Sequence, residues 1–126
     1  MPSEIEAETF APTIKLPPPY KDIEDLIRVE RLPTIWCPGC GIGIALKWIL
    51  RAIKDSVVPI ERHVLVGGIG CTARAPGYVR LDSYHVLHGR AIPFAIGLKL
   101  ANPNLEVTVI GGDGDILAIG MSHFVH

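Results

Sequence analysis

Three cysteines are the residues of this 126-residue chain with the most distinctive chemistry. Cys37 and Cys40 lie in a Cys-Pro-Gly-Cys motif directly after Trp36, and Cys71 follows in a Gly-Ile-Gly-Cys loop. An odd number of cysteines in a chain without an export signal argues against a disulfide framework and favours metal, cluster or redox chemistry. Three interpretations are open: a thiol–disulfide motif, a zinc site and an iron–sulfur cluster.

The sequence around the cysteines separates these interpretations. A Cys-X-X-Cys motif at a helix start lowers the thiol pKa, as redox proteins require, but it should then follow a long buried strand, and here it follows a charged segment. A zinc site would normally add a second such motif or a histidine pair. Cys71 alone would suit a small buried side chain, but its glycine-rich loop favours a third thiolate ligand of an iron–sulfur cluster.

A second motif, Gly111-Gly112-Asp113-Gly114-Asp115, follows an apolar run and precedes a predicted helix. Backbone amides at such a turn bind a diphosphate, and an aspartate there holds the accompanying Mg²⁺. The same residues also suit a tight turn, in which glycine supplies a positive φ and aspartate caps the helix. Both interpretations stay open from the residues alone.

A third motif, from His85 to Arg90, contains two histidines and a guanidinium at a strand-to-helix transition. Such groups suit an anionic cofactor or a carboxylate substrate. Arg74, three residues after Cys71, has the same option, although a solvated loop charge is the simpler interpretation.

The elements that must position these residues alternate along the chain. Apolar runs at 63–68 and 105–112 predict buried parallel strands, and the spacing of apolar residues predicts helices at 41–55 and 91–102, with another after Asp115. This alternation predicts an α/β fold with an open, mostly parallel sheet whose ligands bind at the carboxyl ends of the strands. Two long strands are too few for a doubly wound sheet, so the chain is expected to be truncated.

The first 32 residues differ from the rest. Five prolines in residues 1–21 predict an extended arm, and residues 22–31 predict a short helix, so a boundary is placed between 1–32 and 33–126. The formal net charge of -1, without a basic cluster, argues against nucleic-acid partners. No signal peptide and no apolar stretch of membrane-spanning length is found, so we expect a cytoplasmic protein without a membrane partner.

Four motifs occur in one order: WCPGCG at 36–41, GIGCTAR at 68–74, HVLHGRAIPFAIGLKLANP at 85–103 and GGDGDILAIGMSHFVH at 111–126. Together they resemble the β subunit of thiamine-diphosphate-dependent 2-oxoacid:ferredoxin oxidoreductases, over residues 33–126. The resemblance implies the amino-terminal half of a thiamine-diphosphate-binding domain, part of a doubly wound sheet. The family continues with an asparagine that completes the Mg²⁺ site and a fourth cluster cysteine, and neither occurs here.

The resemblance also implies roles for individual residues. Cys37, Cys40 and Cys71 match three ligands of a [4Fe–4S] cluster, and Asp113 matches the Mg²⁺ ligand. His88 and Arg90 are implied to act in catalysis, His88 by hydrogen bonding to the diphosphate. The residues implied to contact the cofactor are Ile69, Gly70, Thr72, His88, Gly89, Arg90, Ala91, Gly112, Asp113, Gly114 and Asp115.

The implied reaction is oxidative decarboxylation of a 2-oxoacid to an acyl-CoA, with coenzyme A as co-substrate and electrons passing through the cluster to ferredoxin. The motif style favours 2-oxoglutarate, with pyruvate next. The implied partners are an α-type subunit, ferredoxin and a separate or missing carboxy-terminal half of the β subunit, so the isolated chain is expected to be inactive. The alternative hypothesis is a small thiol-redox or metal-binding module that works without thiamine.

Overall fold

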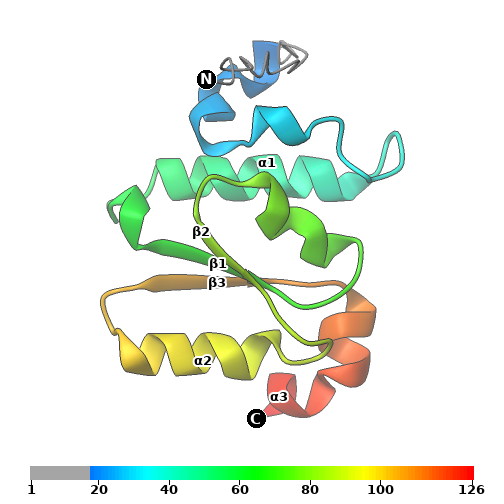
Figure 1. Ribbon diagram of the computed structural model, residues 1–126, viewed down its shortest axis with the longest axis vertical. Coiled ribbons are helices and arrows are strands. Elements are labelled where there is room, and N and C mark those ends of the chain that lie inside the picture. Colours follow the sequence, from blue (N-terminus) through cyan, green and yellow to red (C-terminus); the bar gives the residue numbers. More distant parts are fainter. Residues whose placement is uncertain (1–17) are drawn as a thin grey trace, which may run out of the picture.

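Three parallel strands form the centre of the molecule (Figure 1). The structure, a computed structural model, describes residues 18–126, so most of the predicted extended arm lies outside the described residues. The strands are β1 (His63–Gly67), β2 (Asp82–His85) and β3 (Glu106–Ile110), in the order β2-β1-β3. The central strand β1 is buried along its whole length, which explains its continuous apolar sequence.

The predicted α/β class with a parallel open sheet is confirmed. The predicted strands at 63–68 and 105–112 correspond to β1 and β3, and the predicted helices correspond to α1 (Gly41–Lys54) and α2 (Ala91–Ala101). The sequence did not predict β2 as a third strand. Its residues, Asp-Ser-Tyr-His, are polar and mostly exposed, so it lacks an apolar run.

The helices cover the two faces of the sheet (Figure 1). Side chains alternate along β1, so Leu65 belongs to the core cluster that contains α1, while Val64 and Val66 pack with residues of α2. The α1 stripe of Leu46, Leu50 and Ile53 is buried, as the 3–4 residue spacing predicts.

Residues 18–31 pack into the core on the α1 side instead of standing apart from it. They form two 3₁₀ helices, Pro18–Leu26 and Val29–Arg31, where the sequence predicted an extended end of the arm and one short helix. Two prolines open the first of these helices, where a missing backbone donor costs little. Ile23 and Leu26 are buried in the α1 core cluster.

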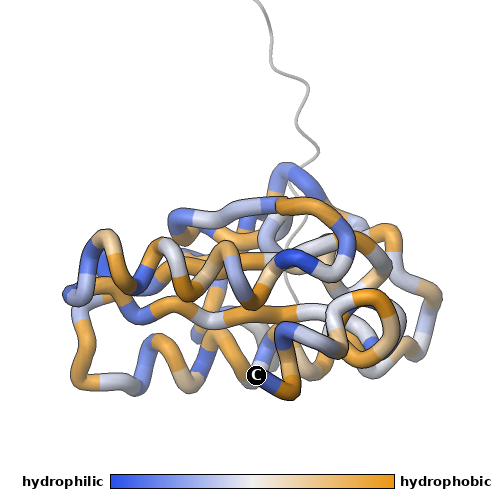
Figure 2. Tube along the Cα trace, turned by 90° about the horizontal axis from the view of Figure 1, so that it is seen from below, coloured by the Kyte–Doolittle hydropathy of each residue, from blue (hydrophilic) through white to orange (hydrophobic). Residues whose placement is uncertain are grey.

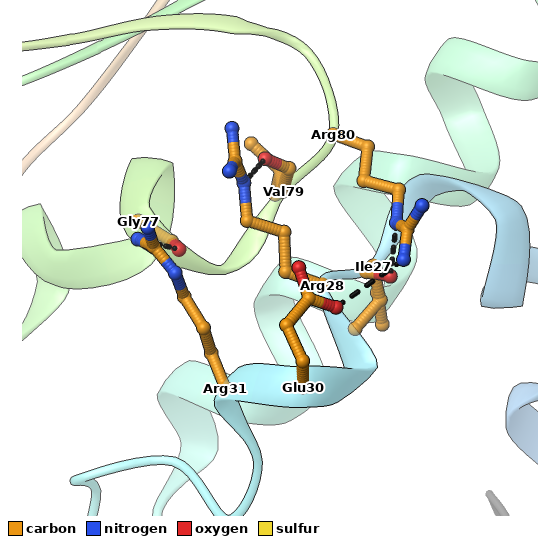
Figure 3. Close-up of polar contacts among 7 residues, drawn as sticks. All are labelled: Ile27, Arg28, Glu30, Arg31, Gly77, Val79 and Arg80. Carbon is orange, nitrogen blue, oxygen red and sulfur yellow. Dashed lines mark hydrogen bonds and ion pairs between the residues drawn. The ribbon is translucent and has the colours of Figure 1, made fainter. Parts of the chain in front are cut away.

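Arginines fasten this amino-terminal segment to the chain that follows the Cys71 loop (Figure 3). Arg28 donates to the carbonyl of Val79 at 2.7 Å, and Arg31 donates to the carbonyl of Gly77 at 2.9 Å. In the opposite direction, Arg80 donates to the carbonyl of Ile27 at 3.1 Å and pairs with a nearby glutamate. The segment from 77 to 80 is thus held between the sheet and residues 18–31.

The chain after β3 begins with a π-helical segment, Gly114–Ile119, and ends with the short helix α3 (Met121–Val125), where the sequence predicted one regular helix. Large apolar side chains of this region and of α2 are exposed, among them Leu100, Phe124 and Val125. Figure 2 views the molecule from this side and shows hydrophobic residues recurring along the chain near its C-terminus. No helix among residues 18–126 is long and apolar enough to span a membrane.

Candidate functional site

The loops that follow the three strands meet at the carboxyl end of the sheet. Ile69 in the loop after β1 and Gly89 in the loop after β2 both donate backbone hydrogen bonds to Asp115, which follows β3. Gly112 lies beside Thr72, since a Cβ built on this glycine would lie 3.5 Å from the Thr72 hydroxyl. The predicted cofactor-contacting segments 69–72, 88–91 and 112–115 therefore lie together at the carboxyl end of the sheet, as expected for parallel strands.

The two aspartates of the glycine-rich motif have different surroundings. Asp113 is exposed and makes no hydrogen bond that caps the following helix, so the interpretation as a capping residue is not supported. The side chain of Asp115 is 1% exposed. Its carboxylate is therefore not available to a cofactor. Only the backbone of Asp115 could make the predicted contact.

Asp115 is held by three donors to one oxygen. Its Oδ1 accepts from Nδ1 of His88 at 2.7 Å, from the amide of Gly89 at 2.8 Å and from the amide of Ile69 at 3.3 Å. Burial alone would raise the pKa of Asp115, but the hydrogen bonds from Gly89, His88 and Ile69 outweigh burial and lower the pKa. The carboxylate is thus stabilised in its ionised form inside the protein.

Glycine is required at position 89, where the backbone turns back toward Asp115. Its φ is +71°, and a Cβ there would lie 2.6 Å from Cγ2 of Ile119 and 3.0 Å from the amide of Gly120. A side chain would therefore meet both an unfavourable backbone conformation and the neighbouring helix. Ala91, another predicted contact residue, is fully buried at the start of α2, whereas Arg90 is exposed.

A cavity of about 410 Å³ adjoins the exposed aspartate. Its polar part is the loop Gly111–Asp113, and its apolar walls come from α2, β3 and the chain after β3. Mg²⁺ in phosphate sites uses one or two carboxylates together with phosphate oxygens and water. The exposed Asp113 carboxylate on a glycine loop fits a Mg²⁺ ion that a bound diphosphate brings with it.

The Cys-Pro-Gly-Cys motif forms a tight turn at the start of α1. The amide of Cys40 donates to the carbonyl of Cys37 at 3.0 Å, and Gly39 has a φ of 80°. Proline followed by a glycine with positive φ is the pattern of a type II turn. Cys40 then precedes the first residue of the helix, and none of the three cysteines forms a disulfide.

Trp36 connects this turn to the third cysteine. Its indole N–H donates to the backbone carbonyl of Cys71 at 2.7 Å, and its ring packs against Tyr78 with centroids 5.1 Å apart. This link was not predicted from the sequence; the position of tryptophan directly before Cys37 was the available signal. All three cysteines consequently lie on two segments that contact each other.

Among residues 18–126, no three His, Cys, Asp or Glu side chains lie close enough to hold a single metal ion. A [4Fe–4S] cluster binds each cysteine through a different iron, so its ligands stand farther apart than those of one ion. Cys37 and Cys71 are exposed and Cys40 is partly exposed. The three thiols thus lie on two adjacent segments and are at least partly accessible.

Replacement of Trp36 by phenylalanine tests the link between the cysteine segments. Trp36→Phe keeps an aromatic ring against Tyr78 and removes the 2.7 Å hydrogen bond to Cys71, so we expect a loss of about 1 kcal/mol in local stability. Hydrogen exchange of the amides in residues 69–74 should become several-fold faster. The matched control is Trp48→Phe, since Trp48 is an exposed residue of α1; equal exchange rates in wild type and Trp36→Phe would contradict the prediction.

Positive charge surrounds His85 at the end of β2. Burial lowers the pKa of His85, and Arg74 lowers it further; a hydrogen bond with the Ala73 backbone opposes this shift, and Arg31 adds to it. Arg31 and Arg74 also line a cavity of about 290 Å³ with Gly77 and Tyr78. The option that Arg74 faces an anion remains a prediction.

The lowered pKa of His85 predicts how stability changes with pH. The unfolded chain binds a proton on this histidine near its ordinary value of 6.5, whereas the folded chain binds it only at lower pH, so stability falls as the pH drops from this value through the folded pKa. The midpoint of thermal unfolding should therefore decrease less between pH 7.5 and pH 5 in His85→Gln than in wild type, by a modest margin. Parallel curves for the two proteins would contradict the assignment.

Residues 68–126 match the family described as thiamine pyrophosphate enzyme, C-terminal TPP binding domain. The chain is 49% identical over 100 residues to 2-oxoglutarate synthase subunit KorB of Methanocaldococcus jannaschii, covering 79% of this chain and 37% of the relative. It is 53% identical over 90 residues to 2-oxoacid:ferredoxin oxidoreductase 2, subunit beta, of Aeropyrum pernix, covering 71% of this chain and 29% of the relative.

A solved structure agrees with these relatives. The fold matches a chain of the 2-oxoglutarate:ferredoxin oxidoreductase from Magnetococcus marinus, solved with 2-oxoglutarate, coenzyme A and succinyl-CoA bound, with a TM-score of 0.69 and 42% identity over 73% of this chain and 32% of that chain. None of these matches is a thiol–disulfide oxidoreductase. This chain spans 37% and 29% of the length of the two curated relatives described above. Its sequence and fold are similar to the amino-terminal part of 2-oxoacid:ferredoxin oxidoreductase β subunits.

Proposed function

We propose that this chain provides the diphosphate-binding loops at the carboxyl end of the sheet and part of the iron–sulfur site. The enzyme to which it contributes would oxidatively decarboxylate a 2-oxoacid, with coenzyme A as acceptor of the acyl group. The observation that carries the proposal is the convergence of the three strand-end loops around Asp115, beside the exposed Asp113. When bound, thiamine diphosphate supplies the electron sink for loss of CO₂.

The loop Gly111–Asp115 is proposed to bind the diphosphate through its backbone, while Asp113 holds Mg²⁺. The loop contains three glycines, so phosphate oxygens can approach the backbone closely, and the following helical segment directs backbone N–H groups toward them. The same end of the sheet carries the other residues predicted to contact the cofactor, which are Ile69, Gly70, Thr72, His88, Gly89 and Arg90. For Asp115 and Ala91, whose side chains are buried, the proposal is limited to backbone contacts.

His88 and Arg90 are proposed to be the catalytic side chains of this chain. The side chain of His88 is 39% exposed, and its Nδ1 is engaged by Asp115, so one side of the ring is fixed and the rest stays accessible. Arg90 donates to the Gly89 carbonyl at 3.3 Å and otherwise remains exposed. A fixed imidazole and a guanidinium suit the binding of an anionic diphosphate or carboxylate.

Cys37, Cys40 and Cys71 are proposed as three thiolate ligands of a [4Fe–4S] cluster. Cys71 lies next to Thr72 and two residues from Ile69, both in a loop proposed to contact the cofactor. Such a position would put the cluster beside the cofactor, from which it accepts electrons for ferredoxin. The fourth ligand would come from a part of the assembly outside this chain.

The proposed partners are an α-type subunit, ferredoxin and the remainder of a β subunit, in a cytoplasmic complex. Relatives named 2-oxoglutarate synthase support 2-oxoglutarate as substrate before pyruvate. The exposed apolar side chains of α2 and α3, including Leu100 and Phe124, are consistent with burial against such partners.

Anaerobic purification of the native complex through a tag on this chain tests the proposal. Mass spectrometry should find an α-type chain and the remainder of a β subunit, and the visible spectrum should show the broad absorbance of an iron–sulfur cluster. The complex should reduce ferredoxin when given 2-oxoglutarate and coenzyme A, and more slowly with pyruvate. A colourless preparation that binds no thiamine diphosphate and reduces no ferredoxin would contradict the proposal.

A further inference from the structure

One buried carboxylate contacts the loops of all three strands. Oδ1 of Asp115 accepts from Ile69 after β1 and from His88 and Gly89 after β2, at distances of 2.7 to 3.3 Å, and Asp115 itself follows β3. We infer that Asp115 is a positioning residue, which holds the His88 ring and the loops after β1 and β2 in place for cofactor binding without contacting the cofactor through its own side chain. This inference rests on the proposed function.

The hydrogen bond from His88 fixes which ring nitrogen carries the proton. An ionised carboxylate only accepts hydrogen bonds, so Nδ1 of His88 must carry a hydrogen. In the neutral ring, Nε2 is then an acceptor, which is the reverse of the tautomer that free histidine prefers. Asp115 thus determines both the orientation of the ring and the hydrogen-bonding character of its accessible nitrogen.

Glycines enclose the carboxylate tightly. A Cβ at Gly68 would lie 2.3 Å from Oδ2 of Asp115, and one at Gly111 would lie 2.9 Å from the same oxygen. Part of the glycine content that suggested phosphate binding therefore makes room for Asp115. Oδ2 itself is buried and makes no hydrogen bond within the described residues, which costs stability. The three hydrogen bonds that Oδ1 accepts from Ile69, His88 and Gly89 explain why a buried carboxylate is present here.

The inference assigns different roles to the two aspartates of the motif. Asp113 is exposed and faces no capping interaction, while Asp115 is enclosed two residues later. One is placed to bind an ion, and the other to hold the residues around it. In metal sites, replacement of a carboxylate that orients a ligating histidine typically changes metal affinity 10- to 100-fold.

A measurement without cofactor tests the link to His88. The chain is labelled with ¹⁵N-histidine in the assembled complex, and the His88 ring signal is assigned by its loss in His88→Gln. We expect the neutral wild-type ring to carry its proton on Nδ1, and Asp115→Ala to shift the proton mainly to Nε2. Asp113→Asn is the matched control and should leave the tautomer unchanged. A wild-type ring protonated on Nε2 would overturn the inference.

A double-substitution cycle separates positioning from a general structural role. Asp115→Asn keeps an oxygen that can accept from the Ile69 and Gly89 amides, and it removes the negative charge that strengthens the hydrogen bond from His88. We expect it to weaken thiamine diphosphate binding by about tenfold, measured by calorimetry on the complex, and by less than about twofold when His88 is already Gln. An equal loss in both backgrounds would overturn the inference. If the wild-type complex does not bind thiamine diphosphate, the proposed function fails, and the tautomer measurement still decides whether Asp115 holds His88.

Discussion

Asp113→Ala is expected to reduce Mg²⁺-dependent binding of thiamine diphosphate by the assembled complex by more than about 100-fold. Asp113 is an exposed carboxylate on the glycine loop after β3, and its side chain has no capping role. Its removal therefore leaves the loop intact but takes away the ligand that would bind the ion and, through the ion, the diphosphate. Calorimetric titration with thiamine diphosphate, with and without Mg²⁺, measures the loss.

A carboxylate at the opposite end of the sheet provides the control. Asp82 is exposed and begins β2, so it lies at the amino ends of the strands, away from the proposed site. Asp82→Ala should bind thiamine diphosphate with the affinity of wild type. Wild-type affinity in Asp113→Ala as well would show that this aspartate does not hold the ion.

Gly68→Ala is expected to destabilise the fold by about 3 kcal/mol, although it adds only one methyl group. The new Cβ would lie 2.3 Å and 2.4 Å from the two carboxylate oxygens of Asp115. Asp115 has little freedom to move away because three hydrogen bonds hold its Oδ1. Hydrogen exchange of the β1 and β3 amides, measured in the assembled complex, should be more than about 100-fold faster than in wild type.

The same substitution at a second glycine should have the opposite sign. A Cβ at Gly97, inside α2, meets nothing within 4 Å, and alanine is a better helix former by about 1 kcal/mol. Gly97→Ala should therefore leave exchange unchanged or slow it slightly. If Gly68→Ala also exchanged as wild type does, the close approach of Asp115 to this glycine would be refuted.

The sequence was sufficient for the elements that bury an apolar face. The stripe that includes Leu46 and Ile53 predicted α1, and the run around Leu65 predicted β1, because burial of such side chains requires those periods. The strand β2 was missed, since its four residues are polar and mostly exposed and show no apolar pattern. Residues 18–21 were missed as the start of a 3₁₀ helix because prolines suggested an extended chain.

The sequence predicted which segments form the candidate site. It did not predict that Asp113 and Asp115 have different surroundings. Parallel strands bring their carboxyl-end loops together in any such fold, so the convergence of the Cys71, His88 and Asp113 segments followed from topology. The contrast between Asp113 and Asp115 depends on which side chain turns inward, and this is set by contacts with Gly68 and His88 that lie far away in sequence. Spacing within a motif carries no such information.

The attachment of three strand ends to one oxygen also bears on how the protein moves. If each loop were fastened separately, each would open and close on its own, and a ligand could order one while the others stayed loose. With Ile69, His88 and Gly89 all bound to Asp115, an opening that moves the carboxylate breaks all of these bonds at once. The three loops at the carboxyl end of the sheet are therefore one cooperative unit, and a ligand that contacts any of them stabilises the others as well.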